Sequence, residues 1–353
     1  MCNKVCCIAL IMLFFAGCVP TQPVTVQTPV VIQPPLDPTP IGTLVRTSTT
    51  VPAVTTAPTN APIRPTTPAP VTGTPLELLT LDLQAQSAVL FDATTGEVLY
   101  AKNAHQKMYP ASTTKIMTAA LALEYIQTDE IIRVGDEVNL TWTSDRIDAQ
   151  KAGLYYGQGL TMKELLYGLL LASGSDAAFA IAVNVAQRES GNDFLADDQA
   201  LSHFSALMNQ KARSIGAVQT NFTNPDGMQD SNHYSTAYDL ALIAQYAMQD
   251  PRFREIVTTS IYTTAQTVTS SGGIYSRSWE NTNRLIQPQD PYYYAPANGI
   301  KTGTTPEAGH CLISSTMVGD NLVIAVVLNS TQEGVWSDSA TLLEYANDNL
   351  SKE

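Results

Sequence analysis

At the segment "PASTTKIMTAALALE", residues 110–124, strand-like alternation gives way to helical periodicity, and this change decides the fold. The segment places a hydroxyl residue, Ser112, three positions before Lys115. Residues three apart share one face of a helix, so the Lys115 amine is within reach of the Ser112 hydroxyl. Pro110 favours a helix that begins at 111–113, with Ser112 at the positive end of the helix dipole. A neutral lysine can take the proton of such a serine, so we expect a nucleophile and its base. An N-cap serine followed by an ordinary lysine is the alternative that this motif alone leaves open.

The regions on either side of this segment predict the fold class. Upstream, residues 87–103 carry two alternating apolar runs around a turn at 93–96, which predicts a β-hairpin. Downstream, helical periodicity continues in four segments, 161–173, 176–188, 204–216 and 235–250. Strand-like runs return at 300–303, 311–318 and 322–329, before a terminal helix from about Asp338. Strands at both ends with helices between them predict one α/β domain, whose sheet is completed by the two ends of the folded chain.

A second motif, "NGIKTGTTPEAGHCL", spans residues 298–312. Lys301, Thr302 and Gly303 supply a cation, a hydroxyl and a residue without a side chain at the end of a predicted strand. We expect Gly303 to leave space for a ligand along the strand edge. Taken alone, these three residues also fit a turn that happens to contain a lysine.

Together the two motifs resemble those of the D-alanyl-D-alanine carboxypeptidases, serine peptidases that are also called low-molecular-weight penicillin-binding proteins. The likeness runs from about residue 84 to residue 345 and includes "LLYGLLLASGSDAA" (165–178) and "NFTNPDGM" (221–228) in the family's order. It implies a β-lactamase/transpeptidase-like fold, in which an antiparallel sheet is flanked by helices and carries a helical subdomain. It also implies a catalytic pair, Ser112 and Lys115, and no cofactor.

The middle motif of this family is Ser-Gly-Asn, and the chain offers two candidates for it. The literal match at 190–192 follows the predicted helix 176–188 and is typical of an ordinary helix end. Residues 173–175, Ser-Gly-Ser, have the flanking sequence that the family motif requires, so we select them. The resemblance then implies that Ser173 relays protons between Lys115 and the leaving amine. Ser175 replaces the family's asparagine and offers the substrate a shorter contact.

The resemblance implies a substrate, the D-Ala-D-Ala end of peptidoglycan stem peptides, and inhibition by β-lactams that acylate Ser112. Many relatives carry an arginine near the position of Val335 that assists the substrate carboxylate, and none is present here. We therefore expect Lys301, Thr302 and Thr304 to hold that carboxylate.

Two further roles follow from the same resemblance. The backbone N–H groups of Ser112 and Thr304 are expected to form the oxyanion hole. We also expect the positive charge of Lys301 to disfavour protonation of Lys115, so that the base is neutral near pH 7.

The N-terminal part of the chain predicts an exported, lipid-anchored protein. Residues 1–17 carry one positive charge and a short apolar run, which is typical of a signal peptide. The following Cys18 completes "AGC", which resembles a lipoprotein cleavage site, and is the predicted lipid anchor. Residues 18–75 hold 14 of the chain's 21 prolines and predict a disordered tether ahead of the catalytic domain, 76–353. We expect a membrane-anchored lipoprotein of the cell envelope; an uncleaved anchor or simple secretion is the alternative.

Composition and absent motifs exclude several other classes. A formal net charge of -13 disfavours nucleic acid as a partner. No His-x-x-x-His pair predicts a zinc site, and no Gly-x-Ser-x-Gly elbow is present. Surface or structural roles are expected for the four histidines, and a turn for Asn224 in "NPDG". Cys311 is the one cysteine of the mature folded part and is expected to be buried and inert.

Two alternatives to the carboxypeptidase remain. A β-lactamase on the same fold needs a water-activating glutamate, and the Glu-x-x-x-Asn spacing is missing from the acidic segment 188–198 that follows residues 173–175. A catalytically weakened wall-binding lipoprotein is favoured by Ser175 and the missing arginine. Because the chain ends soon after the terminal helix, we expect neither the β-rich second domain nor the C-terminal membrane helix of many relatives.

Overall fold

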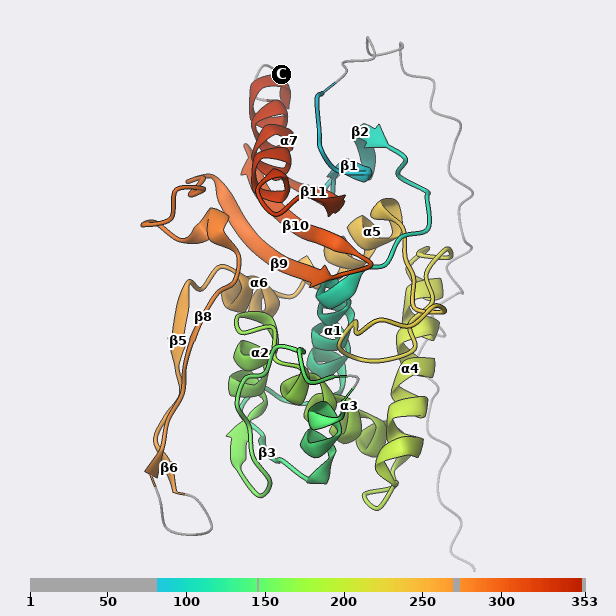
Figure 1. The fold of residues 1–353 in the computed structure, drawn as a ribbon, viewed down its shortest axis with the longest axis vertical. Coiled ribbons are helices and arrows are strands. Elements are labelled where there is room, and N and C mark those ends of the chain that lie inside the picture. The colour runs from blue at the N-terminus through green and yellow to red at the C-terminus, as the bar shows by residue number, and fades with distance from the viewer. Residues whose placement is uncertain (1–80, 145, 269–273, 351–353) are drawn as a thin grey trace, which may run out of the picture. The chain divides into compact units, whose positions relative to one another are not determined.

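The computed structural model describes residues 81–144, 146–268 and 274–350 (Figure 1). Every described residue belongs to one compact unit. The predicted signal peptide, Cys18 and the predicted tether all lie outside the described residues.

A five-stranded antiparallel sheet forms the centre of the domain, with the strand order β2-β1-β11-β10-β9. Its first strand along the chain, β1, pairs with its last, β11, so that Ser87 lies opposite Leu328 and Asp92 opposite Val323. This pairing confirms that the two ends of the folded chain complete the sheet. β9 forms one edge of the sheet. The strands are β1 (Ser87–Asp92), β2 (Glu97–Lys102), β9 (Ala297–Thr305), β10 (Gly309–Val318) and β11 (Asn321–Ser330).

Helices cover both faces of this sheet, which explains why all six residues of β1 are buried. Because successive side chains of a strand point to opposite faces, Val89 and Phe91 join the core shared with the helical region. Ala88 and Leu90 instead pack in the core beneath α7 (Gly334–Leu350). On the other face, α5 (Ala237–Met248) contacts β1 and β11.

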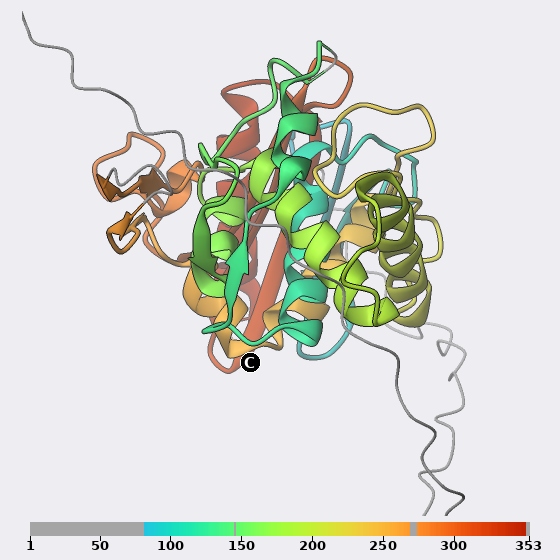
Figure 2. The same cartoon turned by 90° about the horizontal axis from the view of Figure 1, so that it is seen from below.

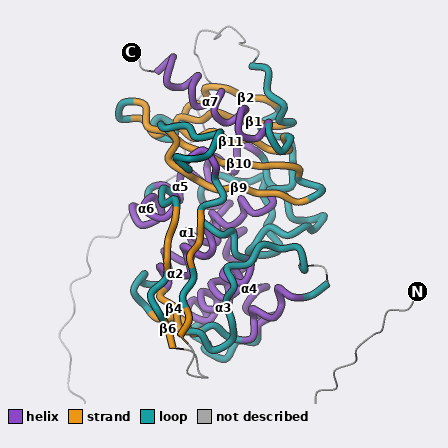
Figure 3. The backbone as a smooth tube through the Cα atoms, turned by 60° about the vertical axis from the view of Figure 1, so that its left-hand side comes forward, coloured by secondary structure: helices purple, strands orange, loops and turns teal. Residues whose placement is uncertain are grey.

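The remaining helices form a region below the sheet, packed around α1 (Lys115–Tyr125) (Figures 1 and 2). Figure 3 shows these helices on one side of the sheet strands. Local signals set the helix ends: Thr161 and Glu164 form a reciprocal capping box, and Gly191 ends its helix in the left-handed conformation. The other helices are α2 (Met162–Leu170), α3 (Ser175–Ser190), α4 (Asp197–Ser214) and α6 (Pro251–Val257). None of the described helices is long and apolar enough to span a bilayer.

Most predicted elements are present, and the differences have local causes. The predicted hairpin is β1–β2, and the predicted helices correspond to α1–α5 and α7. α4 begins at Asp197, whereas the sequence predicted a start at residue 204. The first turn opens with Asp197 and Asp198, so it shows no apolar periodicity from which its start could be predicted. The sequence did not predict α6 or three two-stranded sheets, whose strands of two or three residues are too short to show alternation. These are β3–β4 (Ile131–Arg133, Gly159–Thr161), β5–β8 (Ile261–Thr263, Ser278–Glu280) and β6–β7 (Thr267–Val268, Ile274–Tyr275).

A buried carboxylate ties the start of the described chain to the terminal helix. Asp338 of α7 is 3% exposed and accepts hydrogen bonds from the backbone N–H groups of Gln84 and Ala85. Its Oδ2 also accepts from the Ser330 hydroxyl at the end of β11. One side chain thus joins the segment before β1, the end of β11 and α7.

We predict that Asp338→Ala lowers the free energy of unfolding by about 2–4 kcal/mol, because three donors, two of them in buried hydrogen bonds, lose their acceptor. Asp348→Ala, on an exposed position of the same helix, serves as the control and should change it by less than about 0.5 kcal/mol. Denaturant unfolding measures both variants. Equal stabilities would contradict the role of Asp338 as the anchor.

Candidate active site

Ser112 lies in a single 3₁₀ turn, Ala111–Thr114, that leads directly into α1. Helical structure thus begins at Ala111, as predicted, but its first turn is 3₁₀ and the α-helix proper begins at Lys115. The turn is tied to the residue before it, because both the backbone N–H and the hydroxyl of Thr113 donate to the Pro110 carbonyl. Ala111 has a φ of 48°, a conformation that L-residues rarely adopt and that is often found next to functional groups.

The Lys115 amine lies 2.9 Å from the Ser112 hydroxyl and donates a hydrogen bond of 2.7 Å to the Asp226 carbonyl. The Lys115 side chain is 1% exposed. Burial is the main cause that lowers its pKa to about 8, and the Arg146 charge lowers it further. The carboxylates of Asp226 and Asp176 oppose both effects. Near neutral pH a minor but useful fraction of the amine is therefore free to accept a proton.

Asp226 and Arg146 form a buried ion pair beside this amine. The Arg146 Nη1 lies 2.8 Å from Oδ2 and 2.9 Å from Oδ1 of Asp226, whose side chain has no exposed surface. The pKa of Asp226 is held below its usual value, because Lys115 and Arg146 outweigh the effect of burial. The ion pair therefore places two opposite charges beside Lys115: the Asp226 carboxylate raises the pKa of its amine, and the Arg146 guanidinium lowers it.

Two glycines let three segments of the backbone meet around Ser112. A Cβ atom at Gly303 of β9 would lie 3.0 Å from the Pro110 oxygen and from the Ser112 nitrogen. A Cβ atom at Gly227 would lie 1.9 Å from the Ala111 oxygen, and this residue also has a φ of +83°. The space at Gly303, expected to serve a ligand, is thus occupied largely by the backbone of the turn. The absent side chain brings the edge strand against the nucleophile.

Lys301 is also buried, at 1% exposure, and its amine donates to the carbonyl oxygen of Thr302. Burial lowers the pKa of Lys301 well below its ordinary value, and the positive charge of Lys115 lowers it further. The repulsion between the two amines is mutual, so each positive charge disfavours the proton on the other. Asp226 and Asp176 oppose this effect at Lys115 and help it to keep its proton.

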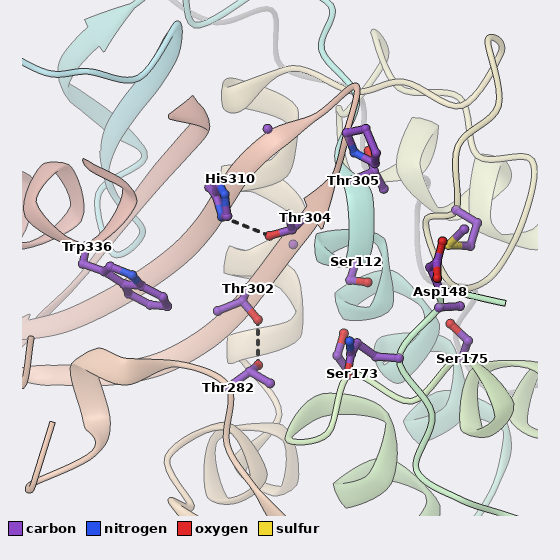
Figure 4. A pocket seen from close by; sticks show the side chains of 16 residues that line it. Ser112, Asp148, Ser173, Ser175, Thr282, Thr302, Thr304, Thr305, His310 and Trp336 are labelled. Carbon is purple, nitrogen blue, oxygen red and sulfur yellow. Dashed lines mark hydrogen bonds between the residues drawn. The ribbon is translucent and has the colours of Figure 1, made fainter. Parts of the chain in front are cut away.

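The segment selected as the middle motif lies between α2 and α3. Ser173 has a φ of 57° and faces Ser112 across the pocket (Figure 4). Ser175 is the first residue of α3, and its side chain helps to lower the pKa of the Asp226 carboxyl group. The literal Ser-Gly-Asn at 190–192 is the C-terminal end of α3, and none of its residues lines the pocket.

The turn that carries Ser112, the segment 173–175 and the edge strand β9 line a pocket of about 740 Å³ (Figure 4). The structure brings six predicted site residues to its wall, with the amine of Lys115 directly behind Ser112. Lys301 lies beneath Thr302 and does not itself line the pocket. The lining residues are Ser112, Asp148, Ala149, Gln150, Ser173, Ser175, Met228, Thr282, Thr302, Gly303, Thr304, Thr305, Pro306, Gly309, His310 and Trp336. No cluster of metal-binding side chains is found among the described residues.

His233 supports the turn from behind, as a structural histidine. Its Nδ1 accepts a hydrogen bond from the backbone N–H of Thr223, so the ring hydrogen lies on Nε2 and is donated to the Thr114 hydroxyl, 2.8 Å away. Burial lowers the pKa of His233 to about 4, so the ring is neutral at physiological pH. Cys311 is buried as predicted, and burial raises the pKa of its thiol to about 11.

The sequence missed several residues that shape this site. Asn224 does belong to a turn, but the same loop carries the Asp226 carbonyl and carboxylate to the nucleophile. Arg146 is 80 positions from its partner Asp226, and no local pattern links them. Thr282 and Trp336 also come from segments without a motif.

Comparison with known proteins identifies similar chains. A family model described as D-alanyl-D-alanine carboxypeptidase matches residues 74–332. The D-alanyl-D-alanine carboxypeptidase DacF of Bacillus subtilis is 34% identical over 258 residues, which cover 70% of this chain and 58% of that protein. The D-alanyl-D-alanine carboxypeptidase of Streptomyces sp. strain K15 is 37% identical over 258 residues, which cover 71% and 83%. The chain thus spans less than two thirds of the Bacillus relative.

Solved structures show the same fold. The crystal structure of the Streptomyces K15 DD-transpeptidase matches with a TM-score of 0.67 and 34% identity, over 74% of this chain and 97% of that one. The D-alanyl-D-alanine carboxypeptidase DacD of Francisella tularensis matches with a TM-score of 0.64 and 26% identity, over 77% and 72%. These matches confirm the predicted antiparallel sheet flanked by helices.

We predict that Arg146→Met moves the pH dependence of Ser112 acylation to higher pH by about one unit, because a cation that disfavours the Lys115 proton is lost. The reactive form is the neutral amine, so in the unmodified protein the rate should rise as pH passes through about 8. The rate of labelling by a fluorescent penicillin across this range measures the effect.

Arg146→Lys keeps the positive charge and is the matched control, with a profile close to that of the unmodified protein. If Arg146→Met lowered the rate equally at every pH, Arg146 would have only a structural role.

Proposed function

Because the chain belongs to the D-alanyl-D-alanine carboxypeptidase family, we propose that it removes the terminal D-alanine from peptidoglycan stem peptides through an acyl-enzyme. The observation that carries this proposal is the 2.9 Å contact between the buried Lys115 amine and the Ser112 hydroxyl. Both groups lie where the edge strand β9 meets the turn, at the wall of a pocket large enough for a peptide end.

Substrate binding begins on β9. A peptide can add to the outer edge of this strand as a further antiparallel strand, with its C-terminal carboxylate near Thr302 and its scissile bond near Ser112. The carboxylate favours the charged form of Lys301. Protonated Lys301 then disfavours the proton on Lys115 in its turn. The role expected for Lys301 is therefore strengthened in the substrate complex.

The chemical steps use few groups. The Ser112 oxygen attacks the carbonyl carbon of the penultimate D-alanine, while its proton passes to neutral Lys115. The negative oxygen that forms is stabilised by the backbone N–H groups of Ser112 and Thr304. Ser173 passes the proton from Lys115 to the leaving nitrogen, and D-alanine departs with its amine restored. Water then cleaves the ester and regenerates the Ser112 hydroxyl. A β-lactam follows the same first step, and ring opening leaves it attached to Ser112.

The second candidate is transfer of the acyl group to an amine in place of water. It is favoured by one observation, the structural match to a protein named as a DD-transpeptidase. The two outcomes share every step up to the acyl-enzyme and differ only in the acceptor. An assay that includes an amine acceptor therefore reports both products.

We predict that Ser112→Ala abolishes both penicillin labelling and D-alanine release from a D-Ala-D-Ala pentapeptide. Ser173→Ala should lower the rate of release by about 100-fold or more, since proton relay to the leaving amine is lost. Ser190→Ala, in the literal Ser-Gly-Asn, is the control and should retain full activity. The measurement is chromatographic separation of the products.

Undiminished labelling of Ser112→Ala would refute the proposed nucleophile. Rapid turnover of nitrocefin without D-alanine release would instead favour a β-lactamase, and binding without either reaction would favour a wall-binding lipoprotein.

We also propose that the protein is exported and held at a membrane by lipid on Cys18. Residues 1–17 support this proposal through their single charge, short apolar run and small residues before the cysteine. The Pro-rich composition of 18–75 supports a tether between this anchor and the domain.

We predict that Cys18→Ser removes lipid labelling and shifts the protein from the membrane fraction to the soluble extracytoplasmic fraction. Cys7→Ser, within the proposed signal peptide, is the matched control and should remain in the membrane fraction. Metabolic labelling with a fatty acid, followed by cell fractionation, measures both. Persistent labelling of Cys18→Ser would place the lipid elsewhere.

A further inference from the structure

One end of the pocket must recognise a carboxylate, although no lysine or arginine is among the residues that line it. The indole of Trp336, from the first turns of α7, forms the wall where the sequence lacks an arginine near Val335. Arg284 packs on this indole, 5.8 Å from the ring centre, but it is paired with Asp290 and does not line the pocket. The donors at this end are therefore mainly hydroxyl groups.

Thr282 is one of these hydroxyl groups and is held in a defined place. It is exposed but lies between two buried residues, Asn281 and Asn283, at 4% and 0% exposure. The Asn281 amide donates to the carbonyls of Val257 and Thr259, which fixes this segment to the end of α6. The threonine therefore projects into the pocket from a rigid support.

The Thr282 hydroxyl lies 2.6 Å from the Thr302 hydroxyl, and both line the pocket (Figure 4). Each hydroxyl has one hydrogen to donate, so the pair uses one between its oxygens and keeps one for a ligand. The Lys301 amine lies 3.4 Å from the Thr302 oxygen and donates to it. Either hydroxyl can be the donor in this pair. When Thr302 donates to Thr282, the hydrogen of Thr282 is the one left for the ligand.

We propose that Thr282 is a substrate-binding residue, whose hydroxyl, ordered by Thr302, donates a hydrogen bond to the C-terminal carboxylate of the stem peptide. This inference rests on the proposed function and adds a residue from outside the three motifs. The Thr282 hydrogen bond and the positive charge of Lys301 together take the place of an arginine side chain.

The test compares Thr282→Val, which keeps the shape but loses the hydroxyl, with Thr282→Ser, which keeps the hydroxyl. Release of the last residue is measured for a D-Ala-D-Ala peptide and for the same peptide with a C-terminal carboxamide. We expect Thr282→Val to lower kcat/KM for the carboxylate peptide by about tenfold, mainly through KM, because a hydrogen bond to a charged group is lost. For the carboxamide peptide the loss should be less than about twofold, and Thr282→Ser should restore most of the activity.

Thr263→Val is the matched control, since it breaks a similar hydroxyl pair with Ser278, 3.0 Å apart, in a hairpin that does not line the pocket. Equal losses on the two peptides, or none on either, would overturn the inference while the activity of the unmodified protein upheld the proposed function. If the unmodified protein released no D-alanine, the proposed function and this inference would fall together. Thermal unfolding checks that each variant is folded.

Discussion

The structure depends on one buried amine, that of Lys115, held between a serine hydroxyl and a backbone carbonyl. Burying an ammonium group is costly, and the cost rises steeply without opposite charges nearby. Asp226 and Asp176 supply those charges, while Arg146 limits how strongly they hold the proton. The amine is thus charged enough to be tolerated in the core and neutral enough to act as a base. Any change in this balance alters stability and reactivity together.

The need to hold the Lys115 amine and the reacting serines in place also explains the strained backbone around the pocket. Ala111 and Ser173 both adopt positive φ angles, each at a cost of about 1–3 kcal/mol. They flank the nucleophile and the second serine, so the strain orients the reacting hydroxyls. Gly303 and Gly227 permit the close approaches that hold the turn in this shape. Packing of α1 against the surrounding helices compensates for the strain elsewhere in the domain.

Local sequence patterns predicted most residues of the candidate site. They could not predict the effects of charges that come from distant segments of the chain. The three-residue spacing of Ser112 and Lys115 was sufficient to expect their contact, because helical geometry is local. Flanking sequence likewise separated residues 173–175 from the literal Ser-Gly-Asn at 190–192. The charges that set the pKa of Lys115 could not be predicted in the same way, since Asp226, Asp176 and Arg146 come from distant segments. Thr282 and Trp336 lie outside any motif, so only the folded chain places them at the pocket.

The pairing of β1 with β11 has a consequence for biosynthesis. Ser87 cannot meet Leu328 until nearly the whole polypeptide has left the ribosome, so the central sheet closes late. Until then the growing chain has an incomplete core and stays pliable. Folding of the domain is therefore expected to finish only after synthesis, once the last strand is free to pair with the first.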